Sequence, residues 1–289
     1  MNKGTELGAL GDVRGAVAAY DEAVAVLRRL VGRDGRHDLA NVLAAAVAHK
    51  GNALGALGDV RGAAAAYDEA VAIRRRLVER DGRHELASDL AHAVVNKGNA
   101  LRALEDVQGA MAAYDEAIAI LRRLVERDRR TELASDLAKA VMNKGNALRS
   151  LGDVRGAVAA YDEAVAIFRR LVDRNGRTDL ANDLAKAVAS EGIALRSLGD
   201  VRGAVVTYDE AIGILRRLVD RDGRTELAGD LAAMRLYRAE TLLQLGEKAA
   251  AQTEARDAMV VLGKEIQRTQ LAELQKVLDW ANSALKDIL

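Results

Sequence analysis

Apolar residues recur at helical spacing in two successive segments, most clearly between about Arg130 and Asn175. In the first segment they lie three or four positions apart, or at the sum of two such steps, at Leu133, Leu137, Val141, Leu148 and Leu151. In the second they step by three and four, at Val154, Ala157, Tyr161, Ala164, Phe168 and Leu171. This periodicity predicts two helices of about 20 residues each, which we call helix A and helix B.

Polar residues between these segments predict where each helix begins and ends. Thr131 is expected to cap helix A with its side chain. Gly152 can take the left-handed conformation after helix A, and Asp153 can cap helix B. Asn175-Gly176 is expected to end helix B. A tight Gly-Asp turn between two helices predicts an antiparallel hairpin.

The hairpin pattern returns every 47 residues. Its clearest marker is a tyrosine in the phrase A-Y-D-E-A or T-Y-D-E-A, at Tyr20, Tyr67, Tyr114, Tyr161 and Tyr208. Glycines keep the same step, and Glu105 is the one lapse in the turn series. A fixed step indicates one supersecondary unit copied along the chain, with a continuous core between stacked copies. Function is then expected on the long surface of the array.

Composition narrows the class of protein. Half of the 289 residues are apolar and proline is absent, which favours unbroken helices. Lys plus Arg equals Asp plus Glu at 43 each, so the chain lacks the basic excess that nonspecific nucleic-acid binding needs. The absence of cysteine excludes disulfides and thiolate metal sites. No membrane-spanning run or signal peptide is visible, so we expect a soluble cytoplasmic protein.

The register of the repeat resembles that of the tetratricopeptide repeat (TPR) family. The matching residues are a small one, a large apolar one, the turn glycine and a small–aromatic–small series, in the order Gly145, Leu148, Gly152, Ala157, Tyr161 and Ala164. Val141 replaces the family's early aromatic residue, and Arg169 replaces the proline that usually ends helix B. Both helices are therefore expected to be longer than in a standard TPR of about 34 residues.

Repeats of this length resemble those of kinesin light chain and of bacterial regulatory proteins. The resemblance covers residues 1 to about 262. It implies an all-α, TPR-like α-solenoid of stacked antiparallel hairpins, wound as a right-handed superhelix. We divide the chain into a repeat array at 1–264, with five hairpins and a degenerate sixth, and a C-terminal capping helix at 265–289.

The two ends of the array lead to different expectations. Residues 1–4 match residues 142–145 in the middle of helix A, so the first copy begins with half a helix. We expect Tyr20 and Val24 to lack cover there, which would favour self-association through the N-terminal end. The tail Gln267–Leu289 is interpreted as one helix. Its apolar stripe is Leu271, Leu274, Leu278, Ala281 and Leu285, and Trp280 is expected to pack on the last hairpin.

The TPR resemblance also implies where a partner binds, because A helices line the concave surface of TPR arrays and peptides commonly bind there. The predicted groove residues are His92, Asn96, Asn99, Arg102, Lys139, Asn143, Asn146, Arg149, Lys186 and Arg196. Asn side chains can both donate and accept, which suits an extended peptide. The charged members are mostly basic, which favours an acidic partner. Alternatively, the Asn side chains bond to neighbouring A helices and only keep the stack in register.

The residues show no pattern of catalytic chemistry. The four histidines lack the spacing of a zinc site, and the glycines form neither a P-loop nor a dinucleotide fingerprint. The repeated Asp-Glu pairs, such as Asp115-Glu116, are typical of a solvated face. We therefore predict no cofactor, no metal and no nucleic-acid partner. The chain is expected to be a non-enzymatic protein–protein interaction scaffold. The alternative is a sensor or oligomerisation segment of a larger bacterial signalling protein.

Overall fold

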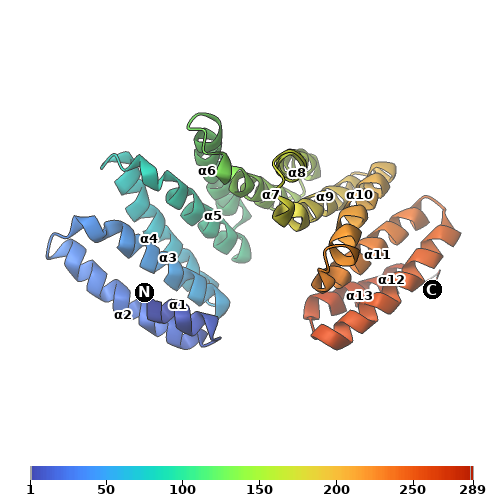
Figure 1. Cartoon of the computed structure of the whole chain (residues 1–289), viewed down its shortest axis with the longest axis horizontal. Coiled ribbons are helices and arrows are strands. Elements are labelled where there is room, and N and C mark those ends of the chain that lie inside the picture. The colour runs from blue at the N-terminus through green and yellow to red at the C-terminus, as the bar shows by residue number, and fades with distance from the viewer. Residues whose placement is uncertain (1, 287, 289) are drawn as a thin grey trace. The chain divides into compact units, whose positions relative to one another are not determined.

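The computed structural model describes residues 2–286 and 288, and these residues form helices joined by short turns, with no strand among them. Figure 1 shows the helices following one another as antiparallel hairpins. The chain divides into two compact units, Met1–Leu151 and Gly152–Leu289. The all-α hairpin architecture predicted from the 47-residue repeat is confirmed in both units.

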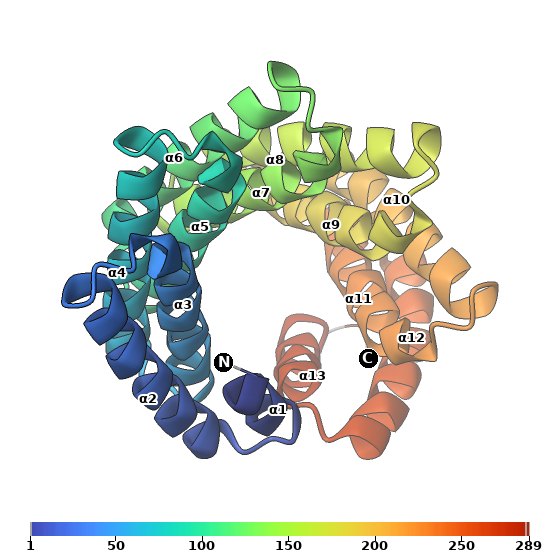
Figure 2. The same cartoon turned by 60° about the vertical axis from the view of Figure 1, so that its left-hand side comes forward.

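The first unit holds three complete A helices and three B helices. Its helices are α1 (Asn2–Ala9), α2 (Val13–Gly32), α3 (Ala40–Ala56), α4 (Val60–Glu79), α5 (Ala87–Ala103), α6 (Val107–Glu126) and α7 (Ala134–Ser150). The odd-numbered helices are the A helices, and α1 is the predicted half helix. Within this unit α3 and α5 lie in one layer, and α2, α4 and α6 lie in the other (Figure 2).

The second unit continues the alternation and ends with an additional helix. Its helices are α8 (Val154–Arg169), α9 (Ala181–Ser197), α10 (Val201–Asp220), α11 (Ala228–Gln244), α12 (Lys248–Thr269) and α13 (Ala272–Ala284). Here α9 and α11 are A helices, while α8, α10 and α12 are B helices. A π-helical turn over Arg170–Arg174 prolongs α8, so the arginine that replaces the family's proline does let the helix continue.

The turn that leads into helix B follows the predicted chemistry. Gly152 has a φ of +82°, and the Asp153 side chain accepts a hydrogen bond of 2.9 Å from the backbone N–H of Gly156. Glu105 takes the same left-handed conformation with a φ of 65°. Glu105 therefore keeps the turn although it replaces glycine. A residue with a side chain is strained in this left-handed conformation, whereas glycine is not.

The predicted cap at Thr131 is wrong. Thr131–Leu133 forms a short 3₁₀ helix before α7, and no side chain caps its start. The guanidinium of the preceding Arg130 instead binds Glu132, with 3.0 Å between Nε and Oε1. The same arginine–acid clamp recurs at the other A-helix starts, in the pairs Arg36–Asp38, Arg83–Glu85, Arg177–Asp179 and Arg224–Glu226. A repeated R-x-D/E pattern therefore marks these junctions.

The repeated tyrosine fills the interior of the hairpin, as its register predicts. Tyr114 of α6 is fully buried against Gly98 of α5. A Cβ added to Gly98 would lie only 2.7 Å from Cε1 of that ring. Gly51 with Tyr67 and Gly192 with Tyr208 repeat the contact. Each glycine makes room for a ring because it has no side chain, so these two positions in each copy are coupled.

The prediction that Tyr20 and Val24 lack cover is wrong. Tyr20 is 5% exposed because its ring packs on Gly4 of α1 and stacks on His49 of α3, with 5.8 Å between ring centroids. Val24 is 2% exposed in a cluster with Leu43 and Val47. The half helix and the following A helix together cover the part of α2 that was expected to be bare.

The C-terminal cap differs in its start from the prediction. The last helix, α13, begins at Ala272, because Gln267 still belongs to α12. Leu274, Ala281 and Leu285 are buried as expected, but Leu271 precedes the helix and is 53% exposed. The helix also ends earlier than predicted, at Ala284, and Leu289 itself lies outside the described residues.

Trp280 of α13 packs on the last hairpin, as predicted. Its ring centroid lies 4.7 Å from that of Tyr237 on α11, at an angle of 44° between the rings. It also joins the buried cluster that includes Leu236 and Leu285. The contact holds α13 against the final A helix of the unit.

Candidate binding surface on the A helices

The ten predicted groove residues lie on three A helices, two in the first unit and one in the second, and we call the side of each helix that carries them its A-helix face. They are His92, Asn96, Asn99 and Arg102 of α5; Lys139, Asn143, Asn146 and Arg149 of α7; and Lys186 and Arg196 of α9. The exposed members are His92, Arg102, Lys139, Arg149 and Lys186, whereas the other five are partly buried. The face is thus accessible at regular intervals along each helix.

In the first unit, asparagine side chains on this face bond to their own protein. The hydroxyl of Tyr114 donates to Oδ1 of Asn99 over 2.8 Å, and Nδ2 of Asn143 donates to the same oxygen over 3.2 Å. Tyr67 donates to Asn52 in the same way over 2.6 Å. Asn99 therefore links the hairpin interior to the next A helix. This is the arrangement expected if these asparagines keep the stack in register.

A basic member of the face is also paired. His92 Nε2 of α5 lies 3.0 Å from Asp136 Oδ2 of α7. The hydrogen bond with Asp136 raises the pKa of His92 against the opposing effect of burial. The same bond lowers the pKa of Asp136. The pair carries no net charge when His92 is protonated, so this histidine contributes little basic potential to the face.

The repeated Asp-Glu pairs of the B helices do more than face solvent. Asp68 binds Lys97 and Asp115 binds Lys144, each over 2.6 Å between Oδ1 and Nζ. Glu116 binds Arg75 of the preceding B helix over 2.5 Å. These pairs join consecutive helices at the same register in two successive copies of the first unit. Pairs of this kind contribute little stability one by one, but they repeat along the stack.

In the second unit, helix α9 departs from the copied sequence at four positions. Ala189, Ser190, Glu191 and Ile193 stand where α7 has Met142, Asn143, Lys144 and Asn146. The rest of the two helices is almost the same, since only Ser135 of α7 also differs, as Asn182 in α9. The substitutions therefore gather on one part of one A helix.

The first consequence falls on the tyrosine of this hairpin. Ile193 replaces the asparagine that would accept its hydrogen bond, and the Tyr208 hydroxyl is buried without a partner among the described residues. Burial raises the pKa of Tyr208 to about 12. A buried hydroxyl without a hydrogen bond costs stability.

The second consequence is a reversal of charge. The lysine that would pair with Asp162 of α8 is Glu191 in α9. Burial and then the charges of Asp162 and Glu210 raise the pKa of Glu191, while Arg169 opposes them. The Asp–Lys attraction of the earlier copies is thus replaced by repulsion between Asp162 and Glu191.

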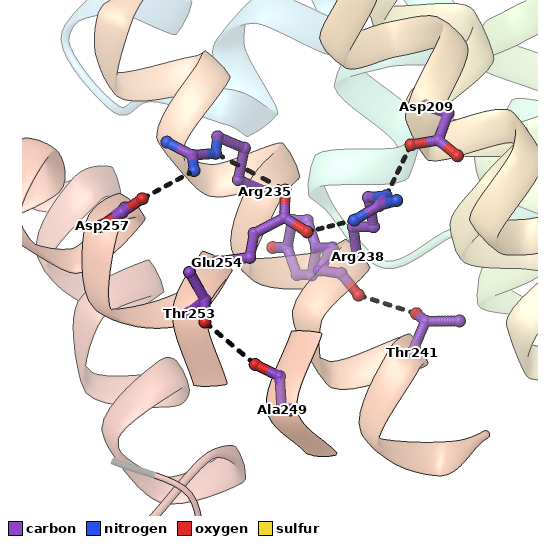
Figure 3. A network of polar contacts seen from close by, with 9 residues as sticks. Asp209, Arg235, Arg238, Thr241, Ala249, Thr253, Glu254 and Asp257 are labelled. Atoms are coloured by element: carbon purple, nitrogen blue, oxygen red, sulfur yellow. Dashed lines mark hydrogen bonds and ion pairs between the residues drawn. The ribbon is translucent and has the colours of Figure 1, made fainter. Parts of the chain in front are cut away.

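Helix α11 carries a network of polar contacts in the second unit (Figure 3). Arg238 binds Asp209 of α10 over 2.6 Å and also binds Glu254 of α12. Arg235 lies 3.5 Å from Glu254 and from Asp257. Figure 3 shows Glu254 between the two guanidinium groups. The network ties α11 to both neighbouring B helices.

Ion pairing also reaches the A-helix face of the second unit. Arg196 of α9 forms an ion pair with Glu240 of α11. Partial desolvation raises the pKa of Asp230 on α11, and the charge of Lys186 opposes this effect. Both basic residues predicted for this unit thus stand close to a carboxylate. These pairings weaken the electrostatic reason for expecting an acidic partner.

A cavity of about 120 Å³ lies between α9 and α11 on this face. Its lining is mostly apolar and consists of Asn182, Ala185, Lys186, Ala189, Leu215, Asp230, Ala233 and Met234. The alanines and Leu215 are buried, whereas Lys186 and Asp230 are exposed. The cavity therefore has an apolar floor and two opposite charges at its mouth.

Of the residues that line this cavity, the sequence prediction identified only Lys186. The signal that could have identified the cavity was the pairing of Ala189 with Ala233, at registers where the earlier pairs include at least one large side chain. Neither a metal site nor a membrane-spanning helix is found among the described residues. No group of three or more His, Cys, Asp or Glu among the described residues could hold a metal ion. Nor is any helix in the described part of the chain long and apolar enough to cross a bilayer.

Comparison with known families identifies the repeat. The tetratricopeptide repeat family matches residues 1–37, 43–84, 90–129 and 137–176, which is more than half of the chain. The chain therefore belongs to the tetratricopeptide repeat family. No curated protein sequence matches it significantly.

Solved structures with the same fold come from several kinds of protein. BtubC (BKLC) from P. vanneervenii has 18% identity and a TM-score of 0.65, over 87% of this chain and 91% of that one. A Podosopora anserina protein described as a kinesin light chain with nearly identical TPR-like repeats has 16% identity and a TM-score of 0.56, over 74% and 92%. A Rap protein complexed with competence and sporulation factor has 17% identity and a TM-score of 0.56, over 99% and 72%. At these identities the likeness concerns the fold alone.

Proposed function

We propose that this chain is a non-enzymatic protein-interaction scaffold that binds a peptide or protein segment on its A-helix face. The observation that carries the proposal is where the copies differ. The tyrosine of helix B is the same in five copies, whereas one register of helix A varies in size and charge, through Ala45, His92, Lys139, Lys186 and Ala233. His92, Lys139 and Lys186 of this register are exposed, whereas Ala233 is buried. Variation on an accessible face of a constant frame is what selective recognition requires.

The irregularities of α9 support the same surface. The unpaired Tyr208 hydroxyl and the repulsion at Glu191 both cost stability, and both arise from substitutions on this helix. Natural proteins break local rules of packing and pairing mainly at functional or strained sites. A purely structural array gains nothing from these changes, so their clustering favours a role in binding.

The partner that we propose has balanced charge. The resemblance and the basic residues led us to expect an acidic segment, but His92, Lys186 and Arg196 each stand close to a carboxylate. A neutral peptide main chain, which both donates and accepts hydrogen bonds, fits such a face better than a strongly acidic one.

Site-specific photocrosslinking tests the surface directly. Benzoylphenylalanine replaces Arg149 or Lys186 on the A-helix face, and Arg123 or Arg216 on exposed positions of the B helices as matched controls. Each protein is irradiated in extract of its source cells. We expect adducts from the A-helix positions and none from the controls. Adducts from the B-helix positions alone, or from neither set, would overturn the proposal.

A further inference from the structure

We propose that the cavity between α9 and α11 is a specificity pocket for one aliphatic side chain, of leucine or methionine size, on an extended and locally uncharged peptide. This inference rests on the proposed function, because it states what one part of the A-helix face recognises. It goes further by naming the pocket, the residue type that enters it and the residues that created it.

The size of the cavity limits its occupant. Its volume of about 120 Å³ is somewhat smaller than the roughly 150 Å³ of engineered apolar cavities that hold benzene. A side chain of four or five non-hydrogen atoms is of comparable size, whereas an indole is too large. The lining of Ala185, Ala189, Leu215 and Ala233 offers carbon atoms on most sides. Met234 adds a flexible thioether that can adapt to leucine or methionine. Asn182 also lines the cavity, and its buried Oδ1 has no hydrogen-bond partner among the described residues.

The repeat register shows how the pocket arose. It requires a small residue at Ala189 and another at Ala233, one on each A helix. The corresponding residue pairs in earlier copies are Ala48 with His92, Val95 with Lys139, and Met142 with Lys186. Each earlier pair includes at least one large side chain, so the combination of two alanines is particular to α9 and α11.

The mouth of the pocket favours a peptide main chain. Lys186 and Asp230 are exposed there, on α9 and α11 respectively. A lysine ammonium donates to a carbonyl oxygen, and a carboxylate accepts from an amide N–H. The two charges balance, so a partner with a strong charge of either sign gains no net attraction at this point. An extended segment can therefore place its backbone between them while one side chain points inward.

Selection from a phage-displayed library of random dodecapeptides tests the inference. The baits are the full wild-type chain, Ala189→Met and Ala189→Val. Both variants fill the pocket with a residue that α7 or α5 carries at this register, as Met142 or Val95, so the fold accommodates them. Ala166→Met on an exposed position of α8 is the control for the substitution itself. Helical circular dichroism during heating verifies that every bait is folded.

The expected result is a motif with one fixed leucine or methionine, enriched on the wild type and on Ala166→Met and lost on both pocket variants. Replacement of that residue by alanine in a synthetic peptide should weaken binding about ten- to a hundredfold, the effect of burying one aliphatic side chain. In a protein labelled at methionine methyl groups, the peptide should shift the Met234 signal and leave those of Met111 and Met142 unchanged.

Two other results would overturn the inference, and they differ in what they imply for the proposed function. If the pocket variants select the same motif as the wild type, the pocket is not used but the scaffold role stands. If no bait enriches any peptide, both the pocket and peptide recognition by this chain fail.

Discussion

The α5–α7 part of the first unit and the α9–α11 part of the second share the same hairpin frame, but their A helices carry different side chains. In the first, Asn99 and Asn143 bond to each other and His92 binds Asp136. In the second, the tyrosine hydroxyl is unpaired and a cavity separates the two A helices. The hairpin frame is common to both. Substitutions on α9 and α11 thus convert a surface whose polar groups bond to one another into one with an unpaired hydroxyl and a cavity.

The largest expected effect comes from breaking what the two regions share. Gly98→Ala and Gly192→Ala each place a Cβ within 2.8 Å of a buried tyrosine ring. Overpacking of this kind should lower the free energy of unfolding by about 1–3 kcal/mol. Urea unfolding followed by helical circular dichroism measures the change.

Gly213→Ala is the matched control, because an added Cβ on this residue of α10 meets nothing within 4 Å. It should raise stability by about 0.5–1 kcal/mol, the usual gain when alanine replaces glycine inside a helix. If all three variants have the same midpoint as the wild type, the coupling of glycine to tyrosine is refuted.

Removal of the tyrosine hydroxyl should change stability differently in the two regions. Tyr114→Phe removes a hydroxyl that binds Asn99 and should cost about 1 kcal/mol. Tyr208→Phe removes a hydroxyl without a partner and should leave stability unchanged or raise it. Both variants are measured by urea unfolding under the same conditions. Equal losses in the two variants would mean that the Tyr208 hydroxyl is bonded in solution.

A smaller effect is expected from the charge reversal in α9. Glu191→Lys restores the lysine found as Lys144 in α7 and should add roughly 0.5–1 kcal/mol by replacing repulsion with an exposed ion pair. The reciprocal change, Lys144→Glu, should lower stability because it removes the pair with Asp115. Thermal unfolding at neutral pH compares them. A gain from Lys144→Glu would contradict the argument.

The same glutamate gives a pH dependence. Its pKa is raised in the folded protein above the ordinary value of 4.5. As pH rises through 4.5 the unfolded chain loses this proton first, so stability contributed by the group falls until the folded pKa is passed. The advantage of Glu191→Gln over the wild type should therefore grow between about pH 4 and pH 6. A constant difference across this range would show that Glu191 is not perturbed.

The smallest predicted effect concerns His92. Its pKa is raised above 6.5, so the stability from its pair with Asp136 is full below pH 6.5 and is lost as pH rises through the folded pKa. The lowered pKa of Asp136 limits the same contribution at the acid side, below about pH 3.8. The free energy of unfolding, measured with urea at a series of pH values, should fall by about a few tenths of a kcal/mol across neutral pH. His92→Lys, which keeps its charge, should show no such fall.

The regular features of this protein could be predicted from sequence because they depend on local rules that repeat. The tyrosine of Tyr114 and the turn glycine of Gly152 recur at a fixed step and so predict where each hairpin turns. Asp153 caps helix B, as its residue type and position predict. The prediction for Thr131 failed because an arginine–acid clamp took the place of a side-chain cap. For Tyr20 it failed because cover came from His49 on another helix, a contact across repeats that no local pattern reveals.

The candidate site was less predictable for a related reason. A search for favourable residues identified Asn99 and Asn143, but such residues also satisfy one another. The cavity exists because Ala189 and Ala233 both have small side chains. A small side chain indicates a cavity only when it is compared with the larger residues of other copies. The informative positions were therefore those where the repeat was broken.

The contact between Trp280 and Tyr237 gives this protein an internal optical probe. The chain has a single tryptophan, and it lies on the helix that closes the second unit. Excited tyrosines transfer energy to a nearby indole, and Tyr208 stacks on Tyr237 with 6.3 Å between centroids. Tryptophan emission on excitation of tyrosine therefore reports the docking of α13 alone, while circular dichroism reports all helices. Since repeat arrays can open from one end, fraying of the cap can be timed separately from the melting of the array.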